Sequence, residues 1–195
     1  MSSSKLSGIL AIIGGTVIHL MLGNIYLWGN ISGYVVAYFH KLGDQHANKD
    51  NAVFVIPLSF VGQTLFNPVG AYLQKRMNPK IILSLGSSIV ILSVYLSSYT
   101  KSWDAFLIIY AVIFPIGIGI CYYTPLMCGW EHLPSKKGAV SGLVIGGFGF
   151  GAFIFGFIST AIANPDNLKK VKEDPSCTGD DCESYFPEEV SDKVP

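Results

Sequence analysis

The chain has 195 residues, of which 50% are hydrophobic and only 13% are charged. A soluble domain normally has about 25% charged residues, so the composition excludes an ordinary water-soluble domain and, for residues 6–165, intrinsic disorder. Thirteen basic and thirteen acidic residues give a net charge of zero, which offers no indication of a nucleic-acid partner.

Five long stretches contain no Asp, Glu, Lys or Arg. A helix needs about 20 mostly apolar residues to cross the ~30 Å hydrocarbon core of a bilayer, and an ionised side chain is costly there. The pattern predicts an all-α, polytopic bundle over residues 1–165, with a bend at Gly23, Gly29 or Gly33 in the first helix. The five spanning helices are expected at about 7–39, 52–74, 80–99, 104–128 and 137–162.

The basic residues between these helices predict an orientation. Lys and Arg in short loops near the membrane concentrate on the cytosolic side. One side of the predicted bundle holds Lys5, Lys75, Arg76, Lys80, Lys136 and Lys137, whereas the other holds Lys41, Lys49 and Lys101. We therefore expect the N-terminus on the cytosolic or matrix-like side and the C-terminal tail on the opposite side, in a membrane that the sequence does not identify.

Residues 166–195 form an acidic polar loop or tail. They contain nine acidic residues against four lysines, and a short helix at 187–193 is the one element expected there. Cys177 and Cys182 lie five positions apart in this segment. On a non-cytosolic face a disulfide between them is plausible, and two free thiols are the alternative.

Polar residues inside the spanning helices point to the function. Gln63 and Asn67 share one helical face, and an amide in hydrocarbon must bond to another helix or face a water-filled cavity. Amides are not residues of the interfacial belt, where Tyr and Trp concentrate, which favours the cavity. Tyr26 and Trp28 in the first helix, and Tyr122 and Tyr123 in the fourth, are further candidates to line it.

The remaining features are interpreted structurally. Gly138, Gly142 and Gly146 repeat every four residues, and an offset pair follows at Gly147 and Gly151; both rows predict close helix packing. His40 and His46 are expected to be loop residues without a partner. The sequence contains no phosphate-binding loop, zinc-binding His pair or nucleophile elbow, so we predict no enzyme, no cofactor and no metal site.

Four segments occur in a characteristic order and spacing, namely Gly23–Gly29, Gly70–Lys80, Phe114–Pro125 and Trp130–Gly151. Together they resemble the N-terminal half of a major facilitator superfamily transporter, in the branch of oxalate–formate antiporters and monocarboxylate transporters. The chain departs from that family in two respects. Lys75 stands where an acid is expected, and Asn78 replaces a glycine. Such transporters also have twelve helices in two halves, whereas five are predicted here.

The resemblance implies roles for the candidate residues. Tyr26, Gln63 and Tyr122 would donate hydrogen bonds to a small carboxylate in a central cavity. Asn67 would line the same cavity, and Trp28 and Tyr123 would shape it. Arg76 and Lys80 would close its cytosolic face. In relatives of this branch, the cations that bind the carboxylate lie in the C-terminal half.

Two functions remain open at this point. The first is a component of a secondary carrier for small carboxylate anions, which works by alternating access with a second half not contained in this chain. The alternative is a non-transporting structural subunit of a larger membrane complex, derived from a truncated transporter. The expected partners are the lipid bilayer, a small organic anion in the first case, and either the missing half or other membrane subunits.

Overall fold

Five helical segments among the described residues are long and apolar enough to cross a membrane. The computed structural model describes residues 3–172 and 184–191. The prediction of an all-α, multi-pass bundle is confirmed, and each observed segment overlaps a predicted one with bounds that differ by a few residues. The segments are Leu6–Lys41, Lys49–Gln74, Pro79–Ser97, Trp103–His132 and Pro134–Ala163.

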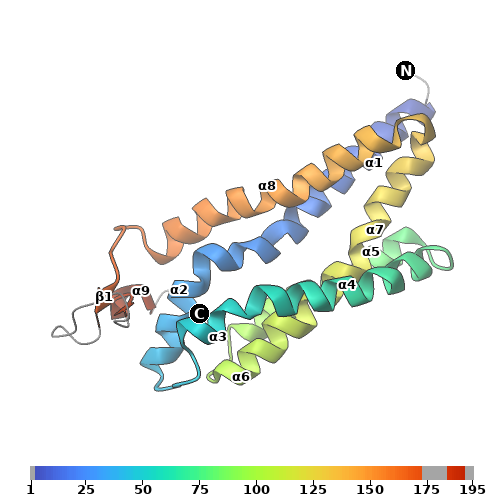
Figure 1. Cartoon of the computed structure of the whole chain (residues 1–195). Coiled ribbons are helices and arrows are strands. Elements are labelled where there is room, and N and C mark those ends of the chain that lie inside the picture. The colour runs from blue at the N-terminus through green and yellow to red at the C-terminus, as the bar shows by residue number, and fades with distance from the viewer. Residues whose placement is uncertain (1–2, 173–183, 192–195) are drawn as a thin grey trace.

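Most of these segments consist of more than one helical element (Figure 1). The elements in chain order are α1 (Ser3–Leu22), η1 (Gly23–Leu27), α2 (Trp28–Lys41), α3 (Lys49–Val53), α4 (Val55–Gln74), α5 (Pro79–Ser97), α6 (Trp103–Phe106), η2 (Leu107–Ile113), α7 (Phe114–His132), η3 (Pro134–Lys136) and α8 (Lys137–Ala163). The tail adds β1 (Val171–Lys172), β2 (Ser184–Tyr185) and α9 (Glu188–Ser191).

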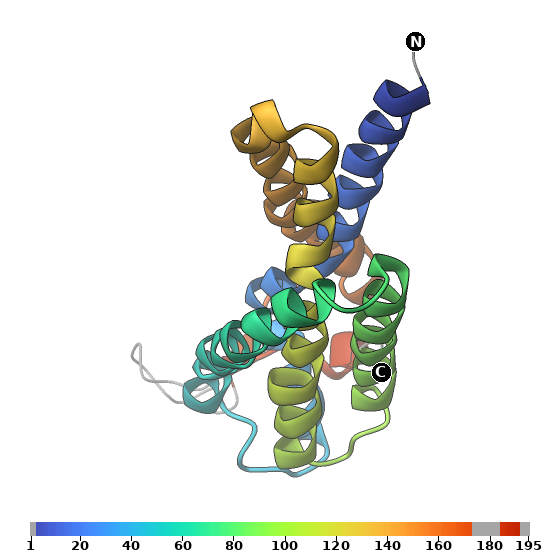
Figure 2. The same ribbon diagram turned by 90° about the vertical axis from the view of Figure 1, so that its right-hand side faces the viewer.

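Helix α7 is the centre of the bundle. It packs against α1, α4, α5 and α8, and Figure 2 shows it running between the α1–α8 pair and the α4 and α5 helices. A helix that is hydrophobic on all sides belongs inside such an arrangement. Glycines on α7 allow the close contact with α4, because a Cβ added to Gly119 would lie only 2.6 Å from the carbonyl oxygen of Gln63.

Two irregular turns have local causes. The first span changes to a 3-10 turn at Gly23, one of the predicted positions for a bend, where the glycine lies directly against the backbone of Phe148 on α8. The fourth span contains the π-helical turn η2 just before Pro115. Proline lacks an N–H and its ring clashes with the carbonyl four residues earlier, and the wider turn, in which the Phe114 N–H bonds to the Ile109 carbonyl, makes room for it.

Among the described residues, one of the two glycine rows packs against another helix and the other does not. A Cβ on Gly147 would lie 2.5 Å from the carbonyl oxygen of Thr16, and Gly151 lies against Leu20, so this pair holds α8 against α1. The row Gly138, Gly142 and Gly146 has no atom of another described element within 4 Å of an added Cβ. Within the described residues this row therefore makes no close helix contact, and its packing against a neighbouring helix stays a prediction. The two rows point to different sides of one helix, and α1 covers only one of them.

Part of the tail returns to the bundle. Strands β1 and β2 pair antiparallel, with Val171 opposite Tyr185 and Lys172 opposite Ser184. Helix α9, within the predicted range 187–193, packs on α2, and its Val190 is 1% exposed beside Tyr34. Cys177 and Cys182 lie outside the described residues, so their pairing stays a prediction.

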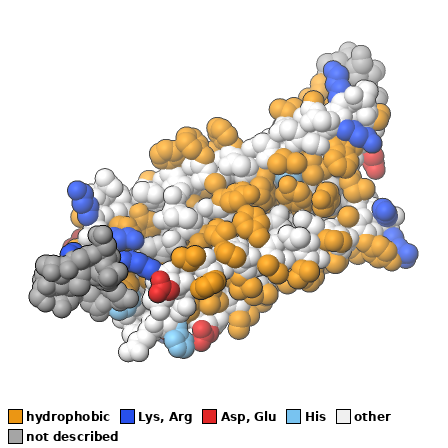
Figure 3. All heavy atoms as spheres, in the orientation of Figure 1, with side chains coloured by type: hydrophobic (Ala, Val, Ile, Leu, Met, Phe, Trp, Pro, Cys, Tyr) orange, Lys and Arg blue, Asp and Glu red, His pale blue; other side chains and the backbone are white. Residues whose placement is uncertain are grey.

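The surface has the pattern of a membrane protein. Figure 3 shows hydrophobic side chains over the middle of the molecule, with Lys, Arg, Asp and Glu gathered at its two ends. Large apolar side chains on every span, such as Leu10, Leu65 and Phe157, are exposed. In lipid such side chains need no cover, and helical backbones satisfy their own polar groups. The chain is an integral, multi-pass membrane protein.

Candidate functional site

A row of amide side chains on α4 faces α7. Gln63 is only 6% exposed, and Asn67 and Gln74 are half-buried on the same side of the helix. The side-chain oxygens of these three residues are buried and have no hydrogen-bond partner among the described residues, and the same holds for the hydroxyl of Thr124 on α7. An unsatisfied buried polar group costs about 1–3 kcal/mol. The described part of the chain therefore leaves a set of polar atoms inside the bundle that a water or a ligand would stabilise.

Three phenols meet where α1 bends. Tyr26 in η1 lies 5.7 Å from the ring of Phe60 on α4 and 5.4 Å from Phe148 on α8, measured between ring centroids. The ring of Tyr122 on α7 lies 5.5 Å from Phe148 and 5.5 Å from Tyr123. Tyr26 is 39% exposed, and Tyr122 and Tyr123 are half-buried. The structure thus brings Tyr26 and Tyr122 against one phenylalanine, Phe148, and places Tyr123 against Tyr122.

His19 is a further candidate, which the sequence pattern of amides and phenols does not include. Its side chain is fully buried beside the phenols, with its ring 5.0 Å from that of Tyr122. One ring nitrogen, Nδ1, contacts the carbonyl oxygen of Gly15 at 3.2 Å, and Nε2 has no partner among the described residues. An ionisable residue within a spanning helix is a functional candidate by default, and that signal was present in the sequence.

Trp28 belongs to a different region from Tyr26. Its Nε1 donates a hydrogen bond of 2.9 Å to the carbonyl oxygen of Ala52, which ties α2 to α3. Its ring also packs against Trp103, Phe106 and Tyr110. The two residues are two positions apart and therefore point to different sides of the helix. Trp28 is a core residue whose edge also lines a cavity, described below.

The predicted gate residues lie at the surface, in and beside the connection between α4 and α5. The guanidinium of Arg76 sits over the ring of Tyr72, 4.8 Å from its centroid. Asn78, which replaces a glycine of the resembled family, caps α5 by accepting a hydrogen bond of 3.0 Å from the backbone N–H of Lys80. The side chains of Arg76 and Lys80 are exposed. No group of His, Cys, Asp or Glu suited to a metal occurs among the described residues.

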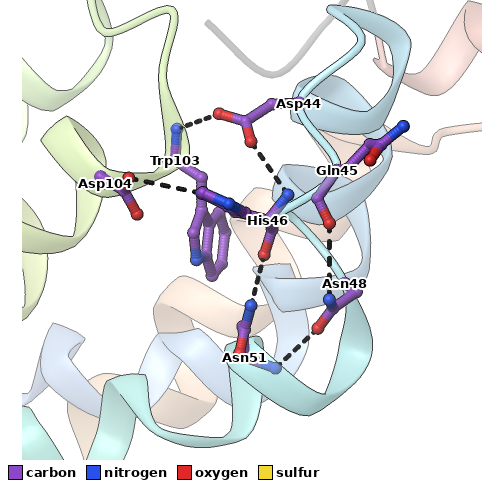
Figure 4. A network of polar contacts seen from close by, with 7 residues as sticks. All are labelled: Asp44, Gln45, His46, Asn48, Asn51, Trp103 and Asp104. Carbon is purple, nitrogen blue, oxygen red and sulfur yellow. Dashed lines mark hydrogen bonds and ion pairs between the residues drawn. The ribbon is translucent and has the colours of Figure 1, made fainter.

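The opposite end of the bundle is joined by a polar network (Figure 4). Asp44, in the loop after α2, accepts hydrogen bonds from the backbone N–H of His46 at 3.0 Å and from that of Trp103 at 2.8 Å. The second bond caps the first turn of α6 from another loop. His46 also lies 3.4 Å from a carboxylate oxygen of Asp104. The expectation that His46 has no partner is wrong, as is that for His40, whose ring stacks on Tyr185.

The chain is similar to known transporters. It is 31% identical over 193 aligned positions to apicoplast pyruvate carrier 1 of Toxoplasma gondii. This alignment covers 82% of this chain and 35% of the relative. An uncharacterised MFS-type transporter of Escherichia coli is 25% identical over 83% of this chain and 39% of its own length. An MFS-type transporter of Aspergillus fumigatus is 24% identical over 82% and 36%.

These relatives define the class of protein but not its details. No protein-family model and no solved structure matches the chain. The matched region spans less than two fifths of each relative's length. All three relatives are named as transporters rather than enzymes. The similarity, at low identity, supports a membrane transporter of the MFS type.

Proposed function

We propose that the chain forms one helical half of a secondary carrier for small carboxylate anions. The observation that carries this proposal is the 31% identity to a protein named as a pyruvate carrier, because pyruvate is a small carboxylate. The exchange of one such anion for another, as in the oxalate–formate branch, is part of the proposal.

The interior polar groups support this function. A carboxylate accepts hydrogen bonds, and the hydroxyls of Tyr26 and Tyr122 can donate them. The side-chain oxygens of Gln63 and Asn67 have no partner among the described residues, and rotating each amide by half a turn presents its NH₂ group instead, which is a pair of donors. Tyr123 shapes this site, whereas Trp28 lies outside it, in the cluster with Trp103, Phe106 and Tyr110.

Alternating access needs a second rigid half, against which this one rocks. The relatives are long enough to contain such a second half, because the chain matches only 35–39% of their lengths. The open glycine row at Gly138, Gly142 and Gly146 offers a smooth face for close contact with that half. We place the N-terminus on the cytosolic side by the distribution of Lys and Arg, so that Arg76 and Lys80 close the cytosolic face.

A counterflow assay tests the function. The complete gene product that carries this sequence is reconstituted into vesicles loaded with unlabelled pyruvate, and the uptake of labelled pyruvate, formate or oxalate is measured. We expect saturable uptake that internal substrate stimulates. Gln63→Leu should abolish it, whereas Leu65→Ala, at a position 65% exposed on the other side of α4, should leave it intact.

Two results would count against the carrier. One is no uptake of any of the three anions by correctly inserted protein. The other is uptake that Gln63→Leu does not change, because the amide would then have no part in the path. A protein that shows no uptake and co-purifies with other membrane subunits at a fixed ratio would be the structural subunit instead.

A further inference from the structure

A cavity of about 300 Å³ opens at the end of the bundle that carries the tail. It lies where α2, the start of the second span and the β1–β2 segment meet, and Figure 1 shows these elements together at one end of the molecule. The size is at the lower end of the range for small-molecule pockets. Its lining includes two lysines, two serines and one edge of a tryptophan, namely Lys49, Lys170, Ser32, Ser184 and Trp28.

Each of the two ammonium groups has defined neighbours in the structure. Lys49 Nζ donates a hydrogen bond to the hydroxyl of Ser184 at 3.3 Å. Lys170 Nζ lies 5.3 Å from the centre of the Phe186 ring. It also lies against Gly33, where an added Cβ would come within 3.2 Å of the nitrogen. A glycine at position 33 therefore leaves the space that the Lys170 ammonium occupies.

This arrangement of charge is unfavourable without an anion. Partial burial and the like charge of Lys49 both lower the pKa of Lys170. Within residues 3–172 and 184–191, neither lysine is ion-paired to a carboxylate. Two cations that share one cavity and repel one another gain free energy from a bound negative charge.

We propose that this cavity binds a small carboxylate anion at the tail-side mouth of the carrier. Lys49 and Lys170 contact the carboxylate, Ser32 and Ser184 donate further hydrogen bonds, and Trp28 provides an apolar wall for the rest of the molecule. The inference rests on the proposed function, because that function makes a carboxylate the cargo. The cavity also supplies the cations that the five uncharged stretches of the spans lack.

The chain itself contains a competing source of carboxylates. Residues 173–183, which connect β1 to β2, include five acidic residues, Glu173, Asp174, Asp180, Asp181 and Glu183. Occupation of the cavity by these side chains is the outcome that the experiment must separate from binding of a free anion.

The experiment follows the lysines directly in the 195-residue chain, reconstituted in nanodiscs of neutral lipid. Reductive methylation with ¹³C-formaldehyde labels each lysine and keeps its charge. NMR spectra of the ¹³C-labelled methyl groups are recorded during titration with sodium pyruvate and, as a control, with the uncharged methyl pyruvate. Variants Lys49→Gln, Lys170→Gln and Gly33→Ala are compared with Lys136→Gln at the other end of the bundle and with Gln63→Leu in the interior.

We expect pyruvate, but not its ester, to shift the Lys49 and Lys170 signals saturably and to raise the pKa of Lys170. Loss of one charge-assisted contact should weaken binding roughly tenfold or more. Lys49→Gln and Lys170→Gln should therefore each show that loss, and Gly33→Ala should weaken binding by displacing the Lys170 ammonium. Lys136→Gln and Gln63→Leu should leave these shifts unchanged.

Three results would overturn the proposal. The first is no response of either lysine to pyruvate. The second is binding that both lysine variants retain and Gln63→Leu abolishes, which leaves the interior site and the carrier intact. The third is a response that appears only after the five acidic residues are replaced by amides, because the cavity would then hold the chain's own carboxylates. Lysine shifts in a protein that fails the counterflow assay would refute the carrier and not the anion site.

Discussion

The contact between α1 and α8 can be tested with two neighbouring glycines. A Cβ on Gly147 would lie 2.5 Å from the carbonyl oxygen of Thr16, whereas ordinary contact begins at 3.4 Å. The backbone of α1 would have to move by about 0.9 Å, and overpacking of this kind costs about 1–3 kcal/mol. No atom of another described element lies within 4 Å of a Cβ added to Gly146, so in the 195-residue chain its substitution lacks this cost.

Comparison of Gly147→Ala with Gly146→Ala isolates the clash. Alanine favours a helix over glycine by about 0.8–1 kcal/mol, and this gain is common to both variants. The difference between their free energies of unfolding should therefore be about 1–3 kcal/mol, which is roughly 5- to 150-fold in the equilibrium constant. Reversible unfolding in mixed micelles with increasing SDS measures it. Equal midpoints for the two variants would refute the close packing of α8 on α1.

Three further predictions concern the tail-side end of the bundle. Asp44→Ala removes the acceptor for the Trp103 N–H and should destabilise the fold by about 0.5–2 kcal/mol, as lost helix caps do; an unchanged SDS midpoint would contradict this. Trp28→Phe removes the hydrogen bond to Ala52 and part of the ring, which should cost about 1–3 kcal/mol in the same assay; a neutral effect would assign the tryptophan to the membrane interface instead. The pKa of Lys170 is lowered in the folded chain, whereas in the unfolded chain it has the ordinary lysine value of about 10.4. Between these two pKa values the folded chain binds fewer protons than the unfolded chain. Stability should therefore rise with pH across this window while pyruvate binding falls, and in Lys170→Gln both slopes should flatten.

The spans were predictable because membrane insertion acts on composition. The exclusion of charge from each stretch and the length needed to cross the bilayer fix the existence of a helix and, to a few residues, its ends. The bend at Gly23 was also within reach, since glycine allows the approach of another backbone. These features depend on each segment alone.

The remaining features depend on how segments meet. The two glycine rows of α8 look alike in sequence, and only the position of α1 decides that Gly147 is covered and Gly142 is open. The contact of His46 with Asp104 joins a loop to helix α6 across 58 positions of sequence, and no local pattern predicts it. The cavity between Lys49 and Lys170 depends on the return of the tail to α2 and is equally invisible in the sequence.

The placement of the candidate site was predictable in part. Helical spacing put Gln63 and Asn67 on one face, and separated Tyr26 from Trp28. The partners of these faces could not be read from the sequence. The packing of Gln63 against Gly119, and the contact of Tyr26 and Tyr122 with Phe148, come from the central position of α7.

Thiol labelling at two adjacent positions of α4 tests most directly whether a carboxylate reaches the polar interior. Phe60 lies beside Tyr26, with ring centroids 5.7 Å apart, whereas Val61 is 55% exposed on the side expected to face lipid. In the complete carrier with its native cysteines replaced, Phe60→Cys should react with a charged, water-soluble thiol reagent, and saturating pyruvate should slow that reaction. Val61→Cys should react with the reagent only slowly and without any effect of pyruvate. Labelling of Phe60→Cys that pyruvate does not slow, or faster labelling of Val61→Cys, would contradict an interior path for the anion.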